Sequence, residues 1–215
     1  MPRRRRAALL ALCLVPLVGC AVGKRPYFSE EPYGPGSLTG DAAVDALLST
    51  LDGATSGPLT AVYAGQVKFG QTDFQAIVEL GGDRRLITLG SAVFRDTPAG
   101  QQTCSTDGSR PCEDGLLAQR ASDTGLSMNF YAADMAVRIR RKAAAMVGPA
   151  TAHTEVFADQ QANCVDLPLS DGVNQFLAVY CVLGNGLVAM VDDSDVLLEL
   201  TMYTPSVDEA RFNLA

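Results

Sequence analysis

The spacing of hydrophobic positions divides the chain into two helices and two groups of strands. Apolar residues recur at helical spacing in residues 41–51 and again in residues 128–146. Elsewhere, runs of β-branched and aromatic residues are separated by short turns rich in glycine and aspartate. The predicted strands span residues 59–69, 72–80, 84–94, 154–158, 163–167, 174–183, 187–191 and 196–203. This order predicts an α+β fold built on antiparallel meanders.

The third predicted strand, residues 84–94, is unusual because it is apolar on both faces. On a continuous strand the apolar residues alternate, with Leu86, Ala92 and Phe94 on one face and Ile87, Leu89 and Val93 on the other. Such a strand requires cover on each side. The segment that follows, residues 97–115, contains Cys104 and Cys112 and is predicted to be a loop.

The predicted helix at residues 128–146 carries an apolar stripe that faces the core. Its members recur at helical spacing: Met128, Tyr131, Met135, Ile139, Ala143 and Met146. Basic residues lie opposite the stripe or flank it, where they suit the negative end of the helix dipole: Arg138, Arg140, Arg141 and Lys142. Methionine suits an adaptable apolar pocket, although such a stripe more often belongs to a core.

The first twenty residues predict export and lipidation. Arginines at positions 3–6 precede a short apolar segment at 7–17, and Leu17-Val18-Gly19-Cys20 completes it. The apolar segment is too short for a stable membrane anchor, and the four-residue motif resembles a bacterial lipobox. This resemblance implies cleavage before Cys20 and a diacylglyceryl group on its sulfur. The alternative is an ordinary secretory signal with an incidental cysteine, and export by the Sec or the twin-arginine route stays open.

The chain is therefore expected to have three parts: a lipoprotein signal peptide at residues 1–19, a lipidated cysteine with a flexible tether at residues 20–38, and a single domain at residues 39–215. The formal net charge is -7, and loss of the signal arginines makes the mature chain more acidic. An acidic protein is a poor partner for nucleic acid or for anionic lipid head groups. The lipid anchor must then hold the domain at the extracytoplasmic face of the cell membrane.

Four cysteines remain in the predicted domain: Cys104, Cys112, Cys164 and Cys181. An even number in an oxidising compartment favours two disulfides. Cys104 and Cys112 would close a short loop. Cys164 and Cys181 are symmetric about a predicted turn at Gly172-Val173, so they face each other across two antiparallel strands. The alternative is a four-cysteine zinc site, but the spacing lacks the closely spaced pair typical of such sites.

The sequence contains no recognisable catalytic centre. His153 is the only histidine and follows a Gly-Pro turn with no identifiable partner. The motifs of serine hydrolases, zinc proteases, phosphate-binding loops and dinucleotide-binding folds are absent. Asp192, Asp193 and Asp195 could gather calcium, but a solvated hairpin turn explains them as well. We therefore expect neither an enzyme, nor a cofactor, nor a metal site.

The order of elements and several short motifs resemble the LolA-like superfamily, and within it the LppX/LprG-type lipoproteins of actinobacteria. The similarity rests on Glu155-Val-Phe, Cys164-Val-Asp-Leu, Tyr180-Cys181, Gly186-Leu-Val and the ending Glu199-Leu-Thr-Met-Tyr203 with Val207-Asp and Phe212. The resemblance implies a strongly curved antiparallel half-barrel with helices across its concave face. It also implies an apolar cavity between sheet and helices and the binding of acyl chains.

We thus predict a membrane-anchored envelope lipoprotein that binds an apolar ligand, a lipid acyl chain, for transport or sensing. The predicted cavity residues come from the helix stripe and from strands facing it: Leu86, Phe94, Met128, Tyr131, Met135, Ile139, Met146, Val179 and Leu198. The alternative is a structural or interaction lipoprotein with a filled core that contacts an envelope protein partner. A cavity of several hundred Å³ with apolar walls would favour the ligand-binding alternative.

Overall fold

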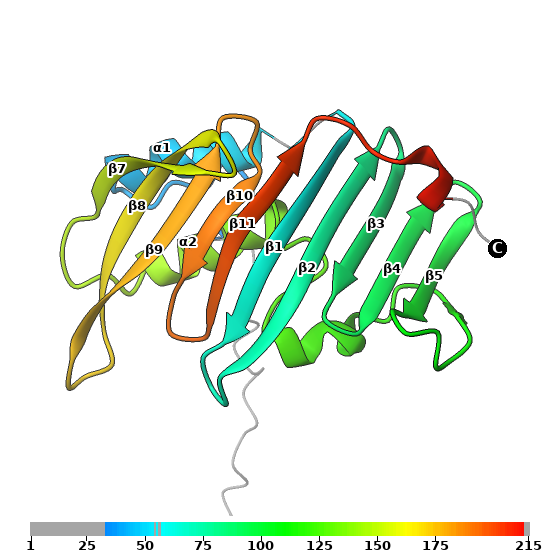
Figure 1. Ribbon diagram of the computed structural model, residues 1–215. Coiled ribbons are helices and arrows are strands. Elements are labelled where there is room, and N and C mark those ends of the chain that lie inside the picture. Colours follow the sequence, from blue (N-terminus) through cyan, green and yellow to red (C-terminus); the bar gives the residue numbers. More distant parts are fainter. Residues whose placement is uncertain (1–32, 54, 56, 213–215) are drawn as a thin grey trace, which may run out of the picture. The chain divides into compact units, whose positions relative to one another are not determined.

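One eleven-stranded antiparallel sheet organises the chain in the computed structural model, which describes residues 33–53, 55 and 57–212 (Figure 1). The predicted signal peptide and Cys20 lie outside the described residues. The strands are β1 (Leu59–Val67), β2 (Thr72–Gly81), β3 (Arg84–Leu89), β4 (Ala92–Thr97), β5 (Gly100–Ser105), β6 (Glu113–Asp114), β7 (Thr151–Phe157), β8 (Gln160–Ser170), β9 (Gln175–Leu183), β10 (Val188–Asp192) and β11 (Val196–Thr204). The prediction of an α+β fold with antiparallel meanders is confirmed.

The sheet consists of two meanders that meet at their first and last strands. Its order is β6-β5-β4-β3-β2-β1-β11-β10-β9-β8-β7, so β1 pairs with β11 and joins the two halves. At this seam Gly65 leaves space for the ring of Phe74, because a Cβ at Gly65 would lie only 2.3 Å from that ring. The absence of a side chain at Gly65 therefore lets an aromatic residue cover the middle of the sheet.

Helices cover one face of the sheet, which we call the helix face; the other is the open face. The helices on this face are α1 (Ala42–Asp52), η2 (Ala118–Thr124) and α2 (Ala133–Ala143). The short helix η3 (Glu209–Phe212) lies on the open face, where Arg211 pairs with Glu79. In Figure 1 α1 and α2 lie behind the sheet, whose open face is toward the reader. The ring of Tyr63 on β1 packs edge-on against Phe130, just before α2, at 5.3 Å between centroids. No helix among the described residues is both long and apolar enough to cross a membrane.

The strong curvature that the family resemblance implied is not found. The sheet is open, with β6 and β7 as its two edges, and Figure 1 shows a broad twisted sheet rather than a half-barrel. At one corner β7 approaches β11, although three strands lie between them in the sheet order, and Phe157 at the end of β7 is buried. The helices accordingly lie on a gently twisted surface and not inside a trough.

The predicted strand at residues 84–94 is two strands. β3 and β4 are joined by a turn at Gly90-Ser91, where Gly90 adopts a positive φ of 54°. Leu89 pairs directly with Ala92, and this pairing reverses the alternation that a continuous strand would have. Ile87, Leu89, Ala92 and Phe94 consequently share the helix face. The apolar residues on both apparent faces of residues 84–94 thus indicate a tight hairpin, and not a single strand with cover on both faces.

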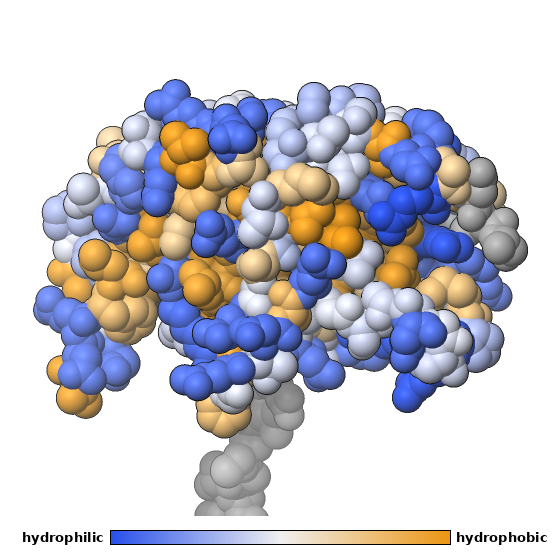
Figure 2. Space-filling model, in the orientation of Figure 1, coloured by the Kyte–Doolittle hydropathy of each residue, from blue (hydrophilic) through white to orange (hydrophobic). Residues whose placement is uncertain are grey.

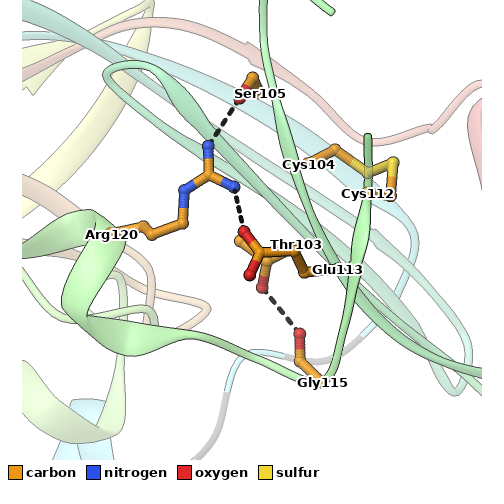
Figure 3. The surroundings of a disulfide bond; sticks show 7 residues. All are labelled: Thr103, Cys104, Ser105, Cys112, Glu113, Gly115 and Arg120. Atoms are coloured by element: carbon orange, nitrogen blue, oxygen red, sulfur yellow. Dashed lines mark hydrogen bonds and ion pairs between the residues drawn. A yellow bond between two sulfur atoms is a disulfide. The ribbon is translucent and has the colours of Figure 1, made fainter. Parts of the chain in front are cut away.

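The segment at residues 97–115 is more ordered than the predicted loop. It forms β5 and β6, and a disulfide between Cys104 and Cys112 closes their connection (Figure 3). The Thr103 hydroxyl donates a hydrogen bond to the Gly115 carbonyl at 2.7 Å, and Arg120 donates to the Ser105 hydroxyl at 2.6 Å. These side-chain bonds give β6, only two residues long, a fixed place on β5.

The second disulfide joins Cys164 and Cys181, which are directly opposite each other on β8 and β9. The structure therefore contains the two pairs expected from the sequence and no thiolate set for zinc among these four cysteines. Both Cys164 and Cys181 are almost fully buried. Two local disulfides fit a domain that folds in an oxidising compartment.

Candidate functional site

The apolar stripe around α2 is part of the hydrophobic core. Ile139 and Met135 are 0% and 2% exposed, and Tyr131 is also buried. Met128 before α2 and Met146 after it are half-buried against the same core. Phe94 and Leu198 belong to this cluster from the sheet side. These predicted cavity residues are thus brought together, as neighbours in a packed core.

The other two predicted cavity residues lie on the open face. Leu86 pairs with Glu79 and Arg95, and Val179 pairs with Asp166 and Asp192. The side chains of these paired residues point to the face of the sheet away from the helices. The expectation that Leu86 and Val179 face the helix stripe is wrong. For Leu86 the cause is the hairpin turn at Gly90-Ser91. Because of this turn Ile87, and not Leu86, pairs with Phe94, so Leu86 and Phe94 lie on opposite faces of the sheet.

Because Met135 occupies a filled core, we expect Met135→Trp to destabilise the domain by about 1–3 kcal/mol through overpacking. The same change at Met202, which is 47% exposed, is the matched control and should alter stability little. Urea unfolding of both variants measures the difference. Equal midpoints for Met135→Trp and the unmodified protein would reveal unfilled space under α2.

A buried ion pair fixes α2 to the turn between β10 and β11. Arg138 donates two hydrogen bonds to Asp193, from Nε at 2.7 Å and from Nη2 at 2.8 Å. Asp193 is 1% exposed, and it also accepts hydrogen bonds from the Tyr180 hydroxyl at 3.0 Å and from the backbone N–H groups of Asp195 and Val196. Every oxygen of this carboxylate therefore has partners.

These contacts determine the protonation states of the cluster. Burial alone would raise the pKa of Asp193, but the Arg138 guanidinium and the two backbone donors bring that pKa below its usual value. Burial also raises the pKa of Tyr180, so its hydroxyl remains a donor. The cluster is accordingly an ionised carboxylate held by a guanidinium, a phenol and backbone amides, which is a structural arrangement rather than an acid–base pair.

The three aspartates considered as a calcium site each have a basic partner. Asp192 pairs with Lys68, Asp193 pairs with Arg138, and Asp195 lies 3.8 Å from Lys142 as well as 3.2 Å from Arg138. Side chains already neutralised in this way have little charge left to attract a cation. The hairpin-turn interpretation of these residues fits their contacts.

Sequence reasoning missed the burial of a second arginine in the basic run. Arg140 is 3% exposed; it pairs with Asp52 at the end of α1, and its Nε donates to the Ser37 carbonyl at 2.9 Å. It thus binds α2 to α1 and to the end of the predicted tether. The helical pattern does place Arg140 beside the apolar stripe, which could have indicated its burial. Its charge, however, favours a solvent-exposed position.

The described residues do line an apolar groove, which involves none of the predicted cavity residues. Ala43, Ala46 and Leu47 of α1 form one wall of a groove of about 490 Å³. The other wall belongs to the edge hairpin, with Ala152, His153 and Thr154 from β7 and Asn163, Cys164 and Val165 from β8. Small and branched side chains dominate this lining, so the groove offers contact surface for an apolar ligand.

Asp41 determines the position of this groove. One of its carboxylate oxygens caps α1 by accepting from the N–H groups of Ala43 and Val44, at 3.0 and 3.2 Å. The other oxygen accepts from the Ala150 N–H at 3.0 Å, directly before β7. The hydrogen bond from Ala150, together with the capping bonds, lowers the pKa of Asp41. One side chain therefore sets the distance between α1 and the start of β7.

The described residues line two further pockets, both separate from the groove between α1 and the β7–β8 hairpin. One, of about 300 Å³, is on the open face beside β3, β4 and β5, and its lining includes Arg95 and Arg211 as well as Leu86. Another, of about 410 Å³, lies beside Arg140 at the end of the tether. The eight remaining predicted cavity residues line none of these three spaces.

His153 acquires neighbours that the sequence did not predict. Its ligand atoms, those of Glu155 and the sulfurs of Cys164 and Cys181 lie within 4.8 Å of one another. The two sulfurs are joined in a disulfide, so they are not thiolate ligands. Only the imidazole and one carboxylate remain, which is fewer ligands than a structural zinc site needs. The Nδ1 atom of His153 lies 3.7 Å from Asp166, a pair on the surface of the hairpin.

Comparison with known proteins found similar solved structures but no matching family or curated sequence. No protein-family model matches the sequence, and no curated protein sequence matches it. Among solved structures, the crystal structure of LprF from Mycobacterium bovis is similar at 10% sequence identity and a TM-score of 0.33. The alignment covers 77% of this chain and 94% of that one. A likeness at this level decides neither fold nor function.

Proposed function

We propose that this protein is an extracytoplasmic lipoprotein of the LppX/LprG type, anchored through Cys20, that binds a lipid acyl chain for transport or sensing. The observation that carries the ligand proposal is the groove between α1 and the β7–β8 hairpin. Its volume of about 490 Å³ falls within the usual range for small-molecule sites. Its lining is mainly apolar, as an acyl chain requires.

The export and anchor proposals rest on different observations. The lipobox-like motif ends at Cys20, and the two disulfides fit an oxidising compartment. Residues 36–41 lead directly into α1 through the Asp41 cap. The tether would therefore connect the membrane to the helix that forms one wall of the groove.

A tryptophan at Ala46 should block the proposed acyl site. Ala46 lines the groove and is solvent exposed, so the larger side chain can fill the groove without entering the core. We expect Ala46→Trp to weaken acyl-chain binding at least about tenfold, a loss of about 1.4 kcal/mol. Native mass spectrometry of the mature chain carrying Cys20→Ser, offered a defined long-chain fatty acid, measures the occupancy.

The matched control is Ala42→Trp, an exposed position on the same helix outside the groove lining. This variant should bind the fatty acid as the unmodified protein does. Equal binding by both tryptophan variants would remove the groove as the site. Absence of binding to any of the three proteins would remove the ligand proposal.

A second candidate function is favoured by the filled core beneath α2. With Met135 and Ile139 almost completely buried, the part of the fold expected to hold a ligand is occupied by the chain itself. An interaction lipoprotein, which contacts an envelope protein through its surface, needs no such cavity. Failure of fatty-acid binding, with the fold intact, would favour this candidate.

A further inference from the structure

The two edges of the sheet are protected very differently. β6 has only two residues and is tied down by the Cys104–Cys112 disulfide (Figure 3). β7 has seven residues, and the six from Thr151 to Val156 are all exposed. It pairs with β8 without any register shift, so no bulge disturbs it. Natural sheets usually protect such an edge with lysine, proline, a bulge or a covering segment.

Residues 151–156 have none of these protections. They contain no lysine or proline, and the side chain of Val156 is 65% exposed. Phe157, the last residue of β7, is the one buried residue of this strand, and β7 approaches β11. A regular strand edge of about five residues is therefore open to pairing with another strand.

The sequence of this edge is complementary to itself. In an antiparallel pair centred on Thr154, His153 of one copy lies opposite Glu155 of the other, and this contact occurs twice. These two side chains are on the open face, where His153 also pairs with Cys164 of β8. On the helix face Ala152 lies opposite Val156, so an exposed apolar side chain becomes covered. A hydrogen bond from the imidazole to the carboxylate on one face and apolar contact on the other both favour this register.

The geometry also suits a tethered protein. The two-fold axis of an antiparallel strand pair runs perpendicular to the local sheet, so both copies present the same face on the same side. Asp41 binds α1 to Ala150 at the start of β7, which puts α1 and the end of the tether on the helix face. Both tethers would therefore leave the pair on one side, as two copies anchored in one membrane require.

We propose that β7 is a homodimerisation edge, through which two copies pair antiparallel about Thr154 to form one continuous sheet. The contact surface is small, because each copy contributes about five residues of one strand. Confinement of both copies to one membrane raises their effective concentration and compensates for a small interface. The occupant of this edge is a second copy of the chain, selected by the His153–Glu155 complementarity.

The test is cysteine crosslinking of the acylated protein in isolated membranes. In the proposed pair the two Thr154 residues face each other with Cα atoms about 4.5–5.5 Å apart, within reach of a disulfide. Thr154→Cys should give a covalent dimer on mild oxidation. Val173→Cys, in the β8–β9 turn and 89% exposed, is the control and should crosslink at least about tenfold less, which corresponds to about 1.4 kcal/mol. Equal crosslinking of the two variants would overturn the proposal.

Charge exchange tests the register. Added to Thr154→Cys, His153→Glu places carboxylates opposite each other twice and should slow crosslinking at least about threefold. The further change Glu155→Arg places opposite charges at both contacts and should recover the rate. No loss with the first change, or no recovery with the second, would contradict the pairing. Unchanged thermal unfolding of each variant establishes that the fold is retained.

The choice of membranes as the medium rests on the proposed anchor, and the two proposals fail in distinguishable ways. Without an anchor, the protein is missing from the membrane fraction. With the anchor but without the dimer, the protein is in the membrane fraction and Thr154→Cys remains monomeric.

Discussion

Replacing Arg138 with methionine should lower the free energy of unfolding by about 3–5 kcal/mol, because it leaves a buried carboxylate without its cation. The Asp193 side chain is 0% exposed, so water cannot replace the guanidinium. The loss would also release the α2 helix from the β10–β11 turn. Arg110→Met is the matched control: Arg110 is exposed in the disulfide-closed segment, and its replacement should change stability by less than about 0.5 kcal/mol.

A double-mutant cycle with Asp193→Asn isolates the pair. If the two side chains stabilise each other, the double variant should be more stable than the sum of the single effects predicts, by about 0.5–3 kcal/mol. Strict additivity of the two losses, or a loss for Arg138→Met no larger than for Arg110→Met, would contradict the buried pair.

The pH dependence follows from the lowered pKa of Asp193. A carboxyl whose folded-state pKa is below its unfolded value of 3.8 stabilises the fold above that value, and the contribution disappears as pH falls through the lower folded pKa. Without Arg138 the main cause of the lowered pKa is removed, and burial raises it instead. The acid-induced loss of stability should therefore begin at a higher pH in Arg138→Met than in the unmodified protein.

Cys20→Ser should abolish acylation and release the protein from membranes. The predicted mature chain is acidic, so electrostatic attraction to anionic lipid cannot replace the anchor. Stable anchoring needs about two acyl chains or one chain with a basic patch, and the lipobox-like motif implies a diacylglyceryl group at this cysteine. Incorporation of a labelled fatty acid and fractionation of membranes measure the two effects.

The matched control is Cys13→Ser, which changes a cysteine within the predicted signal peptide. It should leave both acylation and membrane association unchanged. Labelled protein from Cys20→Ser cells would disprove the anchor assignment. Loss of label in the Cys13→Ser variant as well would mean that the signal segment and not the Cys20 thiol controls the result.

Much of the fold could be predicted because local patterns decided it. Predicted strands at residues 72–80 and 196–203 agree closely with β2 and β11, since turn residues mark their ends. The pairing of Cys164 with Cys181 followed from hairpin symmetry. The β3–β4 hairpin was missed because Gly90-Ser91 interrupts an apolar run that otherwise favours one strand. Curvature could not be predicted, because it depends on the relative positions of distant strands.

The site was harder to predict for a physical reason. Periodicity reveals which side chains become buried, and it correctly indicated Met135 and Ile139. It does not reveal where packing leaves space, which depends on how Asp41 separates α1 from β7. The helical pattern places Arg138 opposite the apolar stripe and Arg140 beside it, and isolated charges avoid the interior, so the burial of their charged groups was not predicted. Their partners, Asp193 and Asp52, are 55 and 88 residues away, a distance that sequence patterns do not bridge.

Locating a bound acyl chain tests the proposed groove between α1 and the β7–β8 hairpin most directly. The mature chain carrying Cys20→Ser would be incubated with a photoreactive long-chain fatty acid, irradiated and digested, and the labelled peptides would be sequenced. We expect labels within residues 43–47 of α1 and residues 152–165 of β7 and β8, with competition by unlabelled fatty acid. Labels confined to residues 128–146, or no competable label at all, would contradict it.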